Sequence, residues 1–166
     1  MIMIDSLLEA ISTSAVGTYI AEDPVAFPWI ETGHVIALVI VFGSILLVDL
    51  RLMGLASRDY SISGLSRTIL PITWVAFLGA VITGGLLFAS NPYGYYGNTA
   101  FRVKLLLLLL AGVNMAVFHL FTQRRGNLDA PGLVPGGARL AGFVSAVLWI
   151  GIIACGRWIG FTMSPF

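Results

Sequence analysis

Five ionisable side chains lie inside otherwise apolar stretches of this sequence, and their types could support chemistry. They are Glu31, His34, Asp49, Lys104 and His119. Ionisable groups inside a membrane-spanning segment are costly and usually face the protein interior, where they bind ions, cofactors or one another. Histidine ligates haem iron and copper, and a methionine such as Met115 is a soft ligand for either metal. We therefore take these residues as candidate binding groups.

Helical spacing sorts these side chains onto two stripes and two depths. At about 100° per residue, each stripe covers a face of about 60°, one with Glu31, His34 and Asp49 and the other with Lys104, Met115 and His119. A rise of about 1.5 Å per residue puts Asp49 about 22 Å from His34, near the level of His119. An outer cluster then contains Glu31, His34 and Lys104. An inner cluster contains Asp49 and His119.

The separation of the two histidines limits the possible metal chemistry. At about 20 Å apart, they cannot both ligate one metal ion or one haem iron within a single chain. A haem b could use one histidine with Met115, with an open position, or with the same histidine of a second subunit. Glu31 and His34 lie one helical turn apart and could hold one cation or orient one another, although two ligands are fewer than a stable metal site requires.

The alternative for both clusters is a structural role. Glu31 would pair with Lys104, and Asp49 would pair with His119 or an arginine, so that each buried charge is compensated. The sequence contains no GxSxG, HExxH, P-loop or dinucleotide motif. We therefore expect electron transfer or metal handling at most, without a complete active site.

The elements that must position these residues are membrane-spanning helices. Of the 166 residues, 58% are hydrophobic and 10% are charged, whereas soluble domains average about 45–50% and about 25%. Four apolar runs can each cross about 30 Å of hydrocarbon, at 29–50, 68–90, 101–122 and 138–160. We therefore predict an all-α, four-helix bundle over residues 29–160 with a short tail at 161–166. The net charge of +1 argues against nucleic acid as a partner and leaves the lipid bilayer.

Residues 1–28 contain no Lys or Arg. They lack the positive start of a signal peptide, and we expect them to be retained. Apolar residues at helical spacing from Ile4 to Ile11 predict an amphipathic helix on the membrane surface. Ser6 and Glu9 have the spacing of a capping box, which would start this helix.

The positive charges predict the orientation. Six arginines lie in or beside the two loops that join the first span to the second and the third span to the fourth. The other three Lys or Arg lie near the opposite helix ends. Positive loops stay in the cytoplasm, so both termini are expected outside. In a bacterial inner membrane this outside is the periplasm.

Small residues recur four positions apart in the second and fourth runs, as at Gly79 and Thr83 or at Ala138, Gly142 and Ala146. Such faces are typical of close helix contacts, either within one chain or with a second chain. They are compatible with a homo-oligomer. They also fit a competing hypothesis, in which the chain is a non-catalytic accessory or scaffold subunit of a larger membrane complex.

The stretch WIETGHVIALVIVFGSILLVDLRLMG, residues 29–54, resembles a set of small bacterial four-helix membrane proteins classed as a domain of unknown function. Further residues look like the same pattern, namely Pro71, Thr83, Gly84, Phe88, Asn98, Phe101, Lys104, Asn114 and His119. That family is distantly similar to CopD-type copper-resistance membrane proteins and, through them, to b-type cytochromes. The resemblance implies a redox or metal-handling component with His34 and His119 as haem or copper ligands. It also implies periplasmic copper at Glu31 and His34, with Met115 as a deeper ligand.

Overall fold

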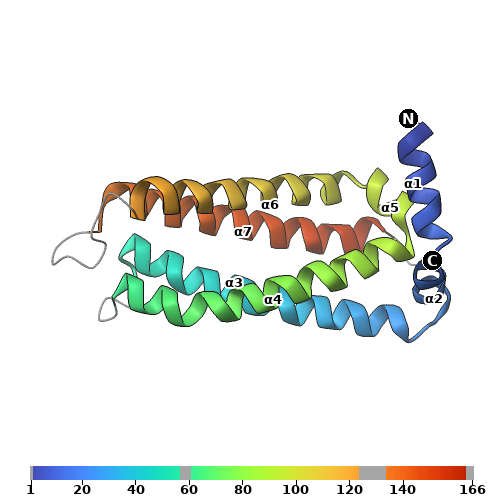
Figure 1. Ribbon diagram of the computed structural model, residues 1–166, viewed down its shortest axis with the longest axis horizontal. Helices are drawn as coiled ribbons and strands as arrows, with labels where there is room; N and C mark the ends of the chain where they lie inside the picture. The colour runs from blue at the N-terminus through green and yellow to red at the C-terminus, as the bar shows by residue number, and fades with distance from the viewer. Residues whose placement is uncertain (1, 57–60, 124–133, 164–166) are drawn as a thin grey trace.

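The structure is a computed structural model that describes residues 2–56, 61–123 and 134–163. Every regular element within these ranges is a helix (Figure 1). In chain order they are α1 Ile2–Ser12, α2 Ala15–Glu22, α3 Ala26–Met53, α4 Ile62–Ser90, α5 Pro92–Gly97, α6 Thr99–Val117, the π-helix η1 Phe118–Gln123 and α7 Gly136–Thr162. The predicted all-α class is therefore confirmed for the described residues.

Four helices are long and apolar enough to cross a membrane, namely α3, α4, α7 and the continuous stretch Thr99–Leu120 of α6 and η1. Their outward faces carry exposed apolar side chains such as Val39, Leu78, Leu109 and Ile150. Helices that are apolar all round are stable in lipid, where the exposed side chains have apolar surroundings. The chain is therefore a multi-pass membrane protein.

Each predicted run lies within a helix or within a helix and its π-helical extension. Side-chain hydrogen bonds to the backbone mark the points where α3 and α4 begin, earlier than their runs. The Asp23 carboxylate accepts hydrogen bonds from the backbone N–H groups of Val25 and Ala26, both at 2.8 Å, where α3 begins. The Ser61 hydroxyl accepts from the Gly64 N–H at 3.0 Å and caps α4. Hydropathy marks only the apolar part of a helix, whereas caps set its ends.

The long helices are arranged as two pairs (Figure 1). Helix α3 packs against α4 and α7, and α6 packs against α7. Val41, Trp149 and Ile152 form the buried centre between α3 and α7. Helices α4 and α6 do not approach each other within 8 Å between Cα atoms. They contact through the stacked rings of Phe88 and Phe101, with centroids 5.6 Å apart, where α4 ends and α6 begins. Toward the other end of the molecule a gap separates α4 from α6.

The N-terminal helices lie at the end of the molecule where α4 ends and α6 begins (Figure 1). Helix α2 packs closely on α4, since a Cβ at Gly17 would lie 2.7 Å from the Ala89 carbonyl oxygen. The predicted capping box at Ser6 is wrong, because α1 already begins at Ile2. The Ser6 hydroxyl instead donates to the Met3 carbonyl at 3.1 Å, within the helix.

Candidate functional site

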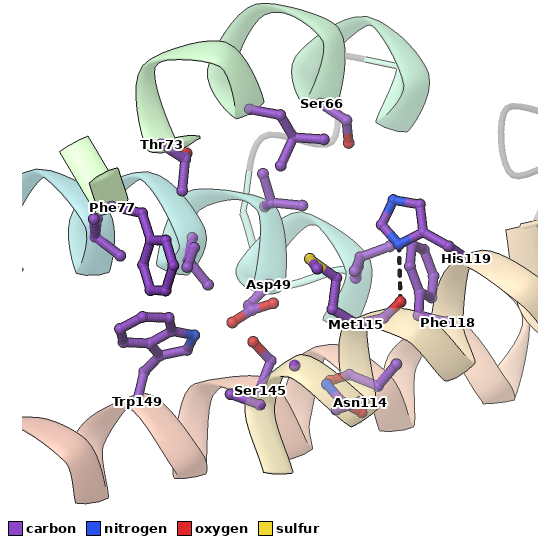
Figure 2. A pocket seen from close by; sticks show the side chains of 18 of the residues that line it. Asp49, Ser66, Thr73, Phe77, Asn114, Met115, Phe118, His119, Ser145 and Trp149 are labelled. Atoms are coloured by element: carbon purple, nitrogen blue, oxygen red, sulfur yellow. Dashed lines mark hydrogen bonds between the residues drawn. The ribbon is translucent and has the colours of Figure 1, made fainter. Parts of the chain in front are cut away.

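A cavity of about 500 Å³ lies between α3, α4, α6 with η1, and α7 (Figure 2). We call it the inner cavity. The residues that line it include Asp49, Phe77, Asn114, Met115, His119, Ser145 and Trp149. Most of its lining is apolar or aromatic, with a few polar groups. Ligand sites in proteins have this composition and volumes of about 300–1,000 Å³. The inner cavity is therefore the candidate functional site.

Asp49 of α3 is the buried polar group of the inner cavity. Its side chain is 4% exposed, and its Oδ2 atom has no hydrogen-bond partner. The hydroxyl of Ser145 on α7 faces the carboxylate from one side (Figure 2). Buried polar atoms without a partner are rare because each costs the lost hydration of the group. Oδ2 is therefore an unused, buried acceptor on a residue that lines a cavity large enough for a ligand.

A close contact between α3 and α7 fixes the position of Asp49. A Cβ at Gly142 would lie 2.9 Å from the Asp49 carbonyl oxygen and 3.0 Å from the Leu52 Cβ. Only glycine lets the two backbones approach this closely. Ala138 and Ala146, one turn on either side of Gly142, are buried as well. This small-residue face of α7 therefore packs within the chain.

His119 stands at the edge of the inner cavity that faces α4 (Figure 2). Its Nδ1 atom lies 2.8 Å from the Met115 carbonyl oxygen, one turn earlier. A carbonyl only accepts, so Nδ1 carries the proton and Nε2 is left as the acceptor of a neutral ring. The histidine belongs to η1, and single π-helical turns occur frequently at functional sites.

Asp49 and His119 line the same cavity, in agreement with their predicted depths, but their side chains are not hydrogen-bonded to each other. Oδ2 of Asp49 has no partner, and Nδ1 of His119 bonds to the backbone. Asn114, which also lines the cavity, connects α6 to α7, since its Nδ2 donates to the Ala141 carbonyl at 3.0 Å. The expected inner cluster therefore exists as a set of cavity-lining groups.

His34 is packed between α3 and α4, away from the inner cavity. The Thr83 hydroxyl donates to the Gly79 carbonyl at 2.7 Å, so His34 Nδ1, 3.0 Å away, donates to the Thr83 oxygen. The imidazole lies against Gly84, where a Cβ would be 3.0 Å from Cε1. A hydrogen bond and a close packing contact thus hold the ring on α4.

Glu31 and Lys104, the other members of the outer cluster, lie apart from each other. Glu31 is exposed, and its charge acts on Tyr95: burial and then this charge raise the pKa of the phenol. Lys104 is partly buried, and its Nζ lies 3.8 Å from the position of a Cβ at Gly156. Among the described residues, no salt bridge is found between Glu31 and Lys104.

The two histidines therefore belong to different sites. His34 contacts Thr83 near the end of α4, whereas His119 lines the inner cavity with Ser66 near its beginning. The 17 residues between Thr83 and Ser66 correspond to about 25 Å of helix. Among the described residues, no group of three His, Cys, Asp or Glu could hold a metal ion.

Sequence reasoning missed the contribution of Ser145, Phe77 and Trp149 to the site. Their residue types are common on apolar helices, and only the packing of α3, α4 and α7 brings them together. Ser145 carried the best available signal, since it lies one turn after Gly142 on a face suited to close contact.

The chain matches the family of unknown function (DUF6644) over residues 8–162. No curated protein and no solved structure matches it. The match therefore includes the fourth long helix, α7, whereas the residues that carried the resemblance end at His119. Similarity to CopD-type proteins or to b-type cytochromes stays a prediction.

Proposed function

The chain belongs to the family of unknown function DUF6644, and because that name assigns no activity, we propose a function from the inner cavity. The protein binds a small, largely apolar molecule inside the membrane. One observation carries this proposal, the unpartnered and buried Oδ2 of Asp49 in an apolar cavity of about 500 Å³. A ligand that donates a hydrogen bond there would remove the cost of the unsatisfied acceptor.

The ligand enters from the lipid, between α4 and α6. No Cα atoms of these two helices lie within 8 Å of each other, and cavity-lining side chains on both are exposed, with Trp74 at 53% and Met115 at 40%. A bilayer concentrates apolar molecules beside such an opening. No large rearrangement of the helices is then needed for binding.

We place the four long helices as a bundle in a bacterial inner membrane with both termini in the periplasm. The support is the distribution of positive charge, because arginines such as Arg51, Arg67 and Arg139 lie at the helix ends far from α1 and α2. Helix α1 then lies on the outer surface, and the inner cavity opens into the cytoplasmic leaflet. Cysteine labelling of the ends of the helices in intact cells tests this orientation.

Chemical analysis of the purified protein tests ligand binding. The protein is extracted with its native lipids, and its bound small molecules are identified by mass spectrometry. Gly112 lines the cavity with no side chain within 4 Å of its Cβ position, so the ring of Gly112→Phe has room there and would take up part of the space for a ligand. Gly85→Phe is the matched control, because Gly85 has the same open surroundings outside the cavity. A molecule held by the wild type and the control, and lost from Gly112→Phe, supports the proposal. Identical contents in all three overturn it.

Haem b or copper, held by His119, is a second candidate. Ligating histidines commonly donate their other ring nitrogen to a carbonyl, as Nδ1 of His119 does to Met115. Met115 and His119 lie one turn apart on the same helix face, so they could both contact a copper ion. They could not lie on opposite faces of one haem.

Absorption spectra before and after reduction, with iron and copper analysis, test this second candidate. His119→Ala should lose the metal and His34→Ala should keep it. The reverse result would instead support the outer copper site predicted at Glu31 and His34. A protein without metal that retains another ligand would exclude both. An accessory or scaffold role, in a homo-oligomer or a larger complex, stays a prediction that co-purification in mild detergent tests.

A further inference from the structure

The charge of the inner cavity has one sign. Among the described residues that line it, Asp49 is the only acid and none is Lys or Arg. His119 is the other titratable group of this lining, and it lies at the exposed edge. A buried carboxylate without a cation nearby is costly, because its charge is neither hydrated nor paired. A positively charged ligand would supply the missing partner.

Aromatic rings line the inner cavity together with this carboxylate. Figure 2 shows Phe77 of α4 and Trp149 of α7 on the side of Asp49 that is away from His119. Trp74 packs edge-on against Phe77, with ring centroids 6.0 Å apart, and holds that ring in place. The faces of aromatic rings attract cations, and the attraction is stronger where water is excluded. Asp49 and the rings therefore favour the same kind of ligand.

We propose that the inner cavity binds an organic cation, an amine whose ammonium group donates to Oδ2 of Asp49 beside Phe77 and Trp149. The apolar remainder of the cavity contacts the hydrocarbon body of the amine. Ser145 faces the carboxylate from α7, and Oδ2 itself is buried, so a rotation of the Asp49 side chain would bring this oxygen to the ligand. This inference rests on the proposed function and names the class of ligand.

A pair of probes that differ in charge tests the inference. Naphthylethylamine is cationic at pH 7, whereas naphthylethanol has nearly the same shape and is neutral. Binding of each to the purified protein in lipid nanodiscs is measured by calorimetry, and the heat measured with Gly112→Phe is subtracted as lipid partitioning. The wild type should bind the amine at least about tenfold more tightly, as expected for a charged hydrogen bond in a dry site. Asp49→Asn should reduce the ratio to near one.

A second variant keeps the test decisive if Asp49→Asn unfolds. Phe77→Leu preserves apolar volume but removes a π face, so it should weaken amine binding about threefold and leave alcohol binding unchanged. Equal affinity of the wild type for both probes overturns the cation inference and leaves the proposed function standing. If the wild type binds neither probe and no ligand co-purifies with it, the cation inference and the proposed function are both overturned.

Discussion

Gly142 of α7 lies against the backbone of Asp49 of α3, so closely that a Cβ at position 142 would be 2.9 Å from the Asp49 carbonyl oxygen. This contact sets the distance between the two helices at the level of the inner cavity. It therefore also sets where the Asp49 carboxylate stands relative to Ser145, which faces it from the same helix as Gly142.

Gly142→Ala should destabilise the protein by about 1–3 kcal/mol, because the added methyl group forces α7 away from α3. Thermal unfolding in detergent measures the effect. Gly160→Ala on the same helix is the control, since nothing lies within 4 Å of its Cβ position. There the gain in helix propensity should leave stability unchanged or raised by up to about 1 kcal/mol. Equal effects of the two substitutions would contradict the close contact.

Gly84→Ala should be harmful only while His34 is present. The new Cβ would lie 3.0 Å from the His34 Cε1 and would push the imidazole away from Thr83. In a His34→Ala background the space is free, so the same substitution should cost little. A double-mutant cycle by thermal unfolding should give a coupling of about 1 kcal/mol. Simple additivity would show that the ring is not held between α3 and α4.

Asn114→Ala should weaken the contact between α6 and α7 by about 1 kcal/mol, because it removes the 3.0 Å hydrogen bond to the Ala141 carbonyl. Val113→Ala, at a neighbouring side chain that is 51% exposed, is the matched control and should have a smaller effect. Chemical unfolding in detergent compares the two. If Val113→Ala cost as much as Asn114→Ala, the hydrogen bond would contribute nothing.

The long helices could be predicted from the sequence because a membrane-spanning helix needs about 20 consecutive, mostly apolar residues. Runs of apolar residues identified all four long helices, and the spacing of His34 and His119 correctly separated them into two sites. The helix ends could not be predicted as well, since they depend on local hydrogen bonds, such as those of Asp23 and Ser61 to the backbone, rather than on hydropathy. The capping box at Ser6 and Glu9 predicted a later start for α1, which begins at Ile2.

The site could be predicted only in part. The depth of Asp49 and His119 placed both at one level, and the structure brings both to the inner cavity. Neither the cavity nor the missing partner of Asp49 could be foreseen, because both depend on how the four long helices are arranged around this residue. Periodicity describes one helix at a time, whereas the gap is a property of all four.

Saturable contact of an apolar probe with Trp149 tests the central claim that the inner cavity is a binding site. Trp149 lines the cavity, and its signal is isolated by replacing the other tryptophans, Trp29, Trp74 and Trp158, with phenylalanine. Bromonaphthalene, which quenches tryptophan fluorescence on contact, is titrated into this variant in nanodiscs. We predict saturable quenching that Gly112→Phe abolishes and Gly85→Phe preserves. Quenching that rises without saturation and equally in all three proteins would mean that the probe reaches Trp149 only from the lipid, and would contradict the claim.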